Sequence, residues 1–252
     1  MDKEIIIRNF SRYAHTYDKY ADAQKWAALK LLGRIKENNF SNILEIGCGT
    51  GNYTKLLKDK FRKAKLTALD ISRDMVGIAQ NKLRGEKIEF IVADAECIEL
   101  KDKFDFVTSN SCFQWFSDLE KALIKYADFL REGGVISFSI FGPLTFCELN
   151  VSLSHISKES SITANHFISK ATIRVILKRI FGEFSITEAR FEESFLSLNS
   201  LLNKIKYSGI RGNGVGNKKI LTPRLLKKLE GVYLSKFNGI RATYQVFLCC
   251  AR

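Results

Sequence analysis

The sequence predicts an α/β fold: a seven-stranded sheet, helices on both of its faces, and an α-helical cap. Two observations support this. Strand-like apolar runs alternate with helical patterns between residues 42 and 141, which is typical of parallel βαβ units. Two further strand-like runs, Phe184–Phe191 and Thr243–Ala251, lie near the C-terminus. We expect them to complete the sheet as an antiparallel hairpin at its edge.

The predicted sheet begins with strand-like runs that are separated by helical segments. Ser72 and Asp118 each precede an apolar helical pattern, and both residue types cap helix N-termini well. Gly133-Gly134 would end the helix that starts after Asp118. The five predicted strands of this part are residues 42–47, 66–70, 88–92, 104–109 and 135–141.

Helical segments flank these five strands on both sides. A long helix is expected over Tyr17–Lys36, and residues 142–182 look polar and helical, with one apolar face that includes Ile173 and Leu177. Thr222-Pro223 is typical of a helix start. We divide the chain into N-terminal helices or a lid (1–40), a ligand-binding core (41–141), a helical cap (142–182) and C-terminal elements that complete the core (183–252).

Length and composition narrow the class of protein. The 252 residues suffice for one sizeable α/β domain with a cap, or for two small domains. No apolar run reaches the ~20 residues that a membrane span needs, and the charged start Met1–Glu4 is unlike a secretion signal. We therefore expect a cytoplasmic protein with no membrane partner. The six cysteines form no zinc-like pattern, so we expect reduced thiols and no metal.

The formal net charge of +13 is large for this length. Such an excess attracts acidic partners, including nucleic acid, anionic lipid and acidic proteins. Charge alone does not choose among them, and a solvated basic surface explains it equally well.

The main chemical motif is the segment LEIGCGTG. Glu45 ends a buried strand, and Gly47, Gly49 and Gly51 form the turn into a helix. Glycines let the backbone approach a ligand closely, and a helix N-terminus favours a negatively charged group. A dinucleotide site is the weaker interpretation, because it requires G-x-G-x-x-G spacing. A second cluster, Gly212–Gly216, has no strand before it and predicts only a turn.

Polar residues at the ends of the next strands identify the ligand class. Asp70 can accept both ribose hydroxyls, Asp94 can accept from an adenine amino group, and Asn110 would face a methyl donor. Open α/β sheets bind ligands at this edge. Together with the glycine turn, these residues predict a site for S-adenosylmethionine. Glu45 and the neighbouring Ile71, Met75 and Ala95 would also contact the cofactor.

The whole chain resembles the malonyl-acyl-carrier-protein O-methyltransferases of biotin synthesis, which have the Rossmann-like class I methyltransferase fold. The glycine-rich loop Gly212–Lys219 departs from that pattern. The resemblance rests on the glycine turn and on the segments Phe10–Asp18, Ala21–Gln24, Asp94–Glu96, Ser109–Trp115, Phe141-Gly142, Glu148-Leu149, Asn165–Phe167, Lys204–Lys206, Leu221-Thr222 and Thr243–Phe247.

This resemblance implies methyl transfer to the free carboxylate of a malonyl thioester on acyl carrier protein, the first committed step toward pimelate and biotin. That carboxylate is ionised near pH 7, so it needs no general base, and alignment in a dry site would provide most of the catalysis. Tyr17 and Gln24 would close over the cofactor, with Tyr17 and Asn110 at the reacting groups. The implied substrate contacts are His15, Gln114, Trp115, Asn165 and Phe167.

A basic stripe provides a candidate docking surface for the acidic carrier protein. Lys170, Arg174 and Lys178 recur every four residues, with Arg179 beside them. Arg174 and Lys178 would steer the carrier toward the site. A solvated helix face is the alternative interpretation.

Three other functions remain open from the residues. The first is methylation of another small molecule, such as a quinone precursor. The second is an RNA methyltransferase, although Ser109–Cys112 stands where an N/D-P-P-[YFW] box would be expected. For this reason we expect no nucleic-acid partner. The third is a binding module that has lost its chemistry.

Overall fold

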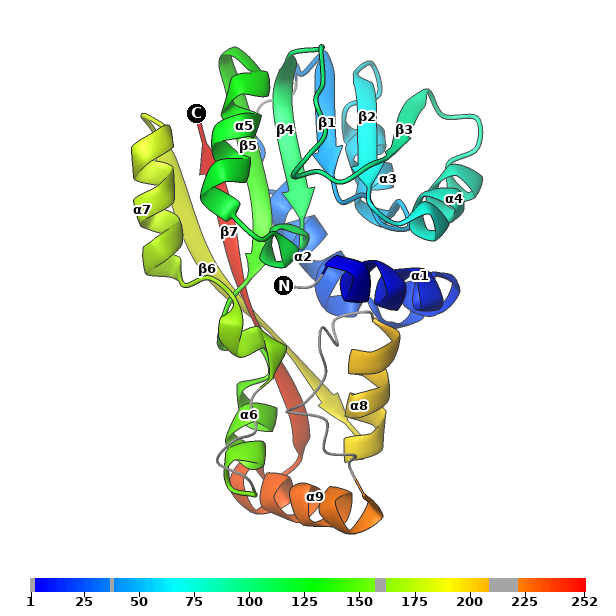
Figure 1. Cartoon of the computed structure of the whole chain (residues 1–252), viewed down its shortest axis with the longest axis vertical. Helices are drawn as coiled ribbons and strands as arrows, with labels where there is room; N and C mark the ends of the chain where they lie inside the picture. Colours follow the sequence, from blue (N-terminus) through cyan, green and yellow to red (C-terminus); the bar gives the residue numbers. More distant parts are fainter. Residues whose placement is uncertain (1–2, 37–38, 157–161, 209–221) are drawn as a thin grey trace.

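The computed structural model describes residues 3–36, 39–156, 162–208 and 222–252. The predicted turn at Gly212–Gly216 lies outside these residues. Figure 1 shows a sheet flanked by helices and a second, smaller group of helices packed on a long β-hairpin.

The seven strands form one sheet in the order β3-β2-β1-β4-β5-β7-β6. β7 lies between β5 and the edge strand β6 and pairs with both in the antiparallel sense, whereas the first five strands pair in parallel. This confirms the predicted fold class. The strands are β1 Asn42–Ile46, β2 Lys65–Asp70, β3 Ile88–Val92, β4 Phe104–Asn110, β5 Leu130–Phe141, β6 Phe184–Phe195 and β7 Ile240–Ala251.

Helices cover both faces of the sheet, as predicted. α2 (Asp22–Leu32) and α3 (Asn52–Lys60) share one apolar core, and α5 (Leu119–Phe129) and α7 (Lys170–Ile180) share the other. α4 (Arg73–Lys82) packs against β2 and β3. The predicted caps are present: Ser72, Asp118 and Thr222 each accept a hydrogen bond from a backbone amide in the first turn that follows.

The hairpin of β6 and β7 extends beyond the sheet and supports a group of helices, α6 (Cys147–Ser154), α8 (Leu198–Tyr207) and α9 (Pro223–Phe237) (Figure 1). Both strands are slightly longer than predicted: β7 begins at Ile240 instead of Thr243, and β6 ends at Phe195 instead of Phe191. The described residues also contain two short 3-10 turns, η1 (Phe113–Trp115) and η2 (Thr163–His166). Residues 142–182 contribute α6 to this group but α7 to the sheet, so their grouping as one cap remains a prediction.

The predicted helix Tyr17–Lys36 is wrong in its bounds. α1 spans Lys3–Tyr20, and α2 begins at Asp22 after Ala21, whose backbone (φ −95°, ψ 36°) leaves the helical region. α2 packs on the sheet face, whereas α1 runs across the carboxyl edge of the sheet, where it contacts α4 and α8 (Figure 1). One straight helix could not cover both surfaces.

The turn before β5 also differs from the prediction. α5 ends at Phe129, and strand pairing resumes at Leu130. Gly133, with φ +72°, and Gly134 lie where the register of β5 against β4 shifts. Gly133 and Gly134 therefore lie within the irregular first part of β5, and the helix α5 ends before them.

A buried cation joins the hairpin lobe to α2. Lys204 of α8 is 5% exposed, and its Nζ donates to Asp22 Oδ2 at 2.5 Å and to Glu193 Oε1 at 2.8 Å. Nearby, the ring of Tyr207 contacts Tyr13 and Tyr20 of α1. The lobe thereby sets the position of both N-terminal helices. Within the described chain, every helix is too short or too polar to cross a membrane.

Candidate functional site

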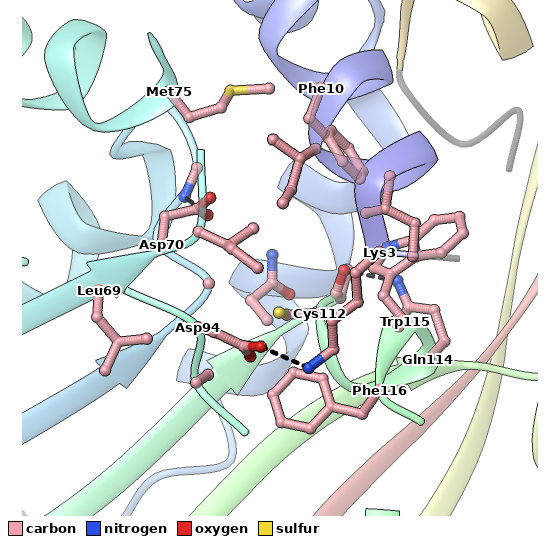
Figure 2. A pocket seen from close by; sticks show the side chains of 18 of the residues that line it. Lys3, Phe10, Leu69, Asp70, Met75, Asp94, Cys112, Gln114, Trp115 and Phe116 are labelled. Carbon is pink, nitrogen blue, oxygen red and sulfur yellow. Dashed lines mark hydrogen bonds and ion pairs between the residues drawn. The ribbon is translucent and has the colours of Figure 1, made fainter. Parts of the chain in front are cut away.

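A pocket opens at the carboxyl edge of the parallel strands, between the glycine turn, the ends of β2 and β4, η1 and the overlying α1 (Figure 2). It encloses about 850 Å³, including the part open to solvent, a size typical of small-molecule sites. Most of the predicted cofactor residues line it: Gln24, Gly47, Gly49, Asp70, Ile71, Met75, Asp94, Ala95 and Asn110. Tyr17, Gln114 and Trp115 line it too.

A second hollow adjoins the first between α2 and α3. Both are bordered by Tyr17, Gln24, Gly47, Gly49 and Asn110. The glycine turn therefore lies between two neighbouring hollows.

The three glycines of the turn have different roles. A side chain on Gly47 would overlap the Cys112 thiol, so glycine is needed here for the turn after β1 to pack against the segment after β4. A Cβ on Gly51 would lie 3.1 Å from that of Ala79, so Gly51 lets α3 and α4 pack and does not line the pocket. Gly49, with φ +53°, has no protein atom within 4 Å of its Cβ position. It faces the space that a ligand would fill.

Asp70 is held rigidly at the end of β2. Its Oδ2 accepts from the Gly49 amide and its Oδ1 from the Ser72 amide, both at 2.9 Å. Burial raises the pKa of its carboxyl although both amides favour the ionised form. The side chain borders the pocket, where its remaining lone pairs can accept ligand hydroxyls.

Glu45 does not reach the pocket, contrary to the expectation that it would contact the cofactor. It is 1% exposed, and its Oε2 has no hydrogen-bond partner among the described residues. Burial raises the pKa of the Glu45 carboxyl to about 8. Thr54 acts to lower this pKa, and the Asp70 charge acts to raise it further. The Glu45 side chain is buried inside the protein, where Thr54 of α3 and Asp70 affect it.

Asp94 is in the pocket, but it has a partner that the sequence did not suggest. Lys3 Nζ donates to Asp94 Oδ2 at 2.6 Å and lies 2.7 Å from Glu96 Oε2. Burial opposes ionisation of Asp94, but Lys3 and the Glu96 amide outweigh it and lower the pKa of Asp94. The contact spans 91 residues, so only the apolar spacing of Ile6, Ile7 and Phe10 hinted that this segment is a helix over the site.

α1 closes the pocket with aromatic rings. Phe10 makes edge contacts with Tyr17 and Trp115, at ring-centroid distances of 6.2 and 5.7 Å. Burial raises the pKa of Tyr17, so its hydroxyl stays protonated at neutral pH and can donate a hydrogen bond. Asp18 fastens this part of α1 to the glycine turn, because it accepts from Thr50 Oγ1 at 2.5 Å and Asn52 Nδ2 at 2.8 Å. Sequence reasoning did not single out Asp18.

Gln24 and Asn110 meet between the two hollows. Asn110 Nδ2 donates to the backbone carbonyl of Gln24 at 3.1 Å, and Ser139 Oγ donates to Asn110 Oδ1 at 2.7 Å. Gln24 Oε1 is buried without a partner in the described structure. A buried acceptor of this kind requires a donor, and the ammonium group of S-adenosylmethionine would provide one. The residues present therefore fit this cofactor.

The other predicted substrate residues lie outside both pocket linings. His15 is exposed on α1, and exposed Asn165 donates to Asn150 Oδ1 at 2.9 Å. Phe167 packs on the far side of Trp115, at 5.6 Å between ring centroids. Arg174 and Lys178 are exposed on α7, whose apolar face is buried on the sheet.

Solved structures with the same fold were found by comparison. The chain matches the YcgJ protein of Bacillus subtilis with a TM-score of 0.62 at 14% identity, over 89% of this chain and 97% of that one. It matches the plantazolicin methyltransferase BpumL, in complex with SAH, with a TM-score of 0.53 at 17% identity, over 100% and 90%. Residues 43–134 match the model of a methyltransferase domain. Fold and pocket define a class I methyltransferase that uses S-adenosylmethionine.

Relatives with higher identity define the family more closely. The malonyl-[acyl-carrier protein] O-methyltransferase of Acetivibrio thermocellus is 34% identical over 100% of this chain and 94% of its own length. That of Priestia megaterium is 38% identical over 98% and 97%. The chain belongs to the malonyl-[acyl-carrier protein] O-methyltransferase family.

Replacing Gly49 with alanine should weaken cofactor binding and also destabilise the fold modestly. The new methyl group would enter the ligand space, so we expect the affinity for S-adenosylhomocysteine to fall about tenfold or more, while the positive φ costs about 1–2 kcal/mol of stability. Titration calorimetry and urea denaturation measure the two effects. Gly85→Ala is the matched control, because Gly85 also has positive φ and open space but lies outside the pocket. Equal affinities for both variants would contradict this placement.

Glu45 should make stability depend on pH. Because its folded pKa of about 8 lies above the ordinary 4.5, the folded state retains a proton that the unfolded state has lost. The contribution of the protonated Glu45 carboxyl to the free energy of unfolding is full below pH 4.5 and is lost as pH rises through 8. Glu45→Gln should remove this loss, gaining on the order of 4 kcal/mol over wild type between pH 5 and 8.5. Urea denaturation across this range tests it, with exposed Glu86→Gln as control; parallel curves for wild type and Glu45→Gln would refute it.

Proposed function

We propose that this protein transfers the methyl group of S-adenosylmethionine to the free carboxylate of a malonyl thioester carried by acyl carrier protein. The observation that carries the proposal is the full-length match to enzymes of that name. The match extends beyond the cofactor core to α1, which lines part of the pocket, and to the hairpin lobe. The relatives give no comparable support to a quinone precursor as the substrate. A cytoplasmic location fits this proposal.

In this proposal the pocket residues align two reactants and provide no general base. Bound S-adenosylmethionine supplies a methyl group activated by a positively charged sulfur. Asp70 would accept hydrogen bonds from the ribose hydroxyls, and Asp94 would accept one from the adenine amino group. Gln24 Oε1 would accept one from the ammonium group. Gly49 leaves room for the methionine end.

The acceptor carboxylate is ionised near pH 7, so its oxygen can attack directly. Phe10, Trp115 and Phe116 line the pocket with apolar surface, which would exclude water from the carboxylate. The protonated hydroxyl of Tyr17 and the amide of Asn110 are the polar groups that would orient it. The three histidines lie outside the pocket lining.

The direct test is methyl transfer by the purified protein. With S-adenosylmethionine, malonyl-carrier protein should gain one methyl group by mass spectrometry, whereas acetyl-carrier protein, which lacks the free carboxylate, should not. Restored growth without biotin, in a host that lacks this step, should accompany it. Methylation of a quinone precursor with no modification of malonyl-carrier protein would contradict the proposal.

The basic side of α7 is the proposed docking surface for the carrier. Lys170 pairs with Glu188 at 3.7 Å and Arg179 with Glu120 at 3.0 Å. Arg174 and Lys178 are exposed and form no ion pair within the described residues, which leaves their charges available to an acidic partner. α7 begins three residues after Phe167, which supports the pocket wall through Trp115.

Reversing both charges (Arg174→Glu with Lys178→Glu) should raise KM for malonyl-carrier protein about tenfold and change it little for malonyl N-acetylcysteamine, because electrostatic docking acts only on the protein substrate. Steady-state kinetics with both substrates measure this. Lys227→Glu with Lys228→Glu on α9 is the control for net charge. Equal changes for both substrates would exclude the docking surface.

A further inference from the structure

The backbone is strained where β4 ends beside the pocket. Asn110 is the last residue of β4 and lines both hollows. The next residue, Ser111, has a φ of +55°, a left-handed conformation that residues other than glycine rarely adopt. Cys112 and Gln114, which follow, line the pocket (Figure 2). A rare backbone conformation at such a place persists only where neighbouring groups hold it.

Ser139 of the neighbouring strand β5 holds the backbone of Ser111. It pairs with Asn110 across the two parallel strands and is fully buried. The Ser111 amide donates to the Ser139 carbonyl at 3.0 Å and to Ser139 Oγ at 2.9 Å. From the other side, Gln114 Nε2 donates to the Ser111 carbonyl at 2.6 Å. Both backbone polar groups of Ser111 are therefore satisfied within the protein.

The same Ser139 hydroxyl is bound to the side chain of Asn110. Its Oγ donates to Asn110 Oδ1 at 2.7 Å. A hydroxyl has one proton and two lone pairs, and here the lone pairs can accept from the Ser111 amide and from the Ser111 hydroxyl, whose Oγ lies 3.4 Å away. The Ser139 proton is thereby left for Asn110, and it fixes Oδ1 as the atom of the amide that faces β5.

The other side of the Asn110 amide is fixed by α2. Asn110 Nδ2 donates one hydrogen to the backbone carbonyl of Gln24 at 3.1 Å. A flipped amide would turn Oδ1 toward this carbonyl, so that two acceptors would face each other, and the Ser139 proton would lose its acceptor. Because an amide nitrogen carries two hydrogens, Asn110 can donate the second one to a ligand in the pocket that it lines.

We propose that Ser139 is a positioning residue for methyl transfer, which acts through Asn110. Its hydroxyl connects the left-handed backbone at Ser111 with the Asn110 amide and keeps one N–H of that amide available to the acceptor carboxylate. The donor is then in place before the substrate arrives, which lowers the cost of aligning the reactants. The inference rests on the proposed function, which assigns Asn110 to the acceptor.

Ser139→Ala removes the hydroxyl and leaves the backbone pairing of β5 in place. We expect kcat for malonyl-carrier protein to fall about tenfold, since a mobile amide is oriented for only part of the time, while KM for S-adenosylmethionine changes by less than about twofold. The matched control is Ser137→Ala on the same strand. Ser137 is also buried, and it donates to the Cys249 carbonyl at 3.1 Å, outside the pocket lining. This control should lose similar stability in urea and keep its kcat.

Two further variants separate positioning from general damage. In an Asn110→Ala background, Ser139→Ala should lower kcat no further, because the group through which Ser139 acts is gone. A full tenfold loss in that background would contradict the proposal. Ser139→Cys retains a weak donor of similar size and should lose less activity than Ser139→Ala. It is also the variant to measure if Ser139→Ala does not fold.

A second readout needs no methyl acceptor. In NMR spectra of the full chain, the side-chain amide signals of Asn110 can be assigned by their loss in Asn110→Ala. These hydrogens should exchange with water about tenfold faster in Ser139→Ala, and not in Ser137→Ala, because the freed amide opens more often. Unchanged exchange would overturn the proposal. Wild-type protein that does not methylate malonyl-carrier protein would refute the proposed function, while the exchange rates would still decide whether Ser139 holds Asn110.

Discussion

The close approach of the segments that follow β1 and β4, at the carboxyl edge of the sheet, is the constraint on which the site depends. Gly47 lies against Cys112 with no room for a side chain. From this point the chain leaves β1 toward α3 and leaves β4 toward α5, on opposite faces of the sheet. This divergence opens the crevice in which α/β sheets bind ligands, and it brings Asp70 and Asn110 to the same pocket.

The crevice becomes an enclosed pocket because charged contacts hold α1 over it. Asp18 fixes one end of the helix to the glycine turn, and Lys3 reaches Asp94 and Glu96 at the other. The buried Lys204 then ties α2 to the hairpin lobe through Asp22. The lobe therefore affects the cofactor site through the placement of the two N-terminal helices, although its own helices α6 and α9 contribute no residue to the pocket lining.

Sequence reasoning succeeded where local patterns suffice. Strands buried on both faces, such as β1, appear as short apolar runs, and Ser72 and Asp118 signal helix starts by their own chemistry. Asp70, Asp94 and Asn110 could be grouped because parallel strands end at one edge. The break at Ala21 and the roles of Lys3 and Asp18 were missed, since Lys3 and Asp18 contact partners 91 and 32 residues away.

The sequence by itself determined the order of the elements, the glycine turn and the family, because turn chemistry and hydrophobic period act over a few residues. Tertiary structure decided which acids face the ligand. Asp70 borders the pocket, whereas Glu45, also near the end of a strand, is buried outside the pocket lining. That difference arises from side-chain alternation along the strands and from packing of distant helices, neither of which a motif records.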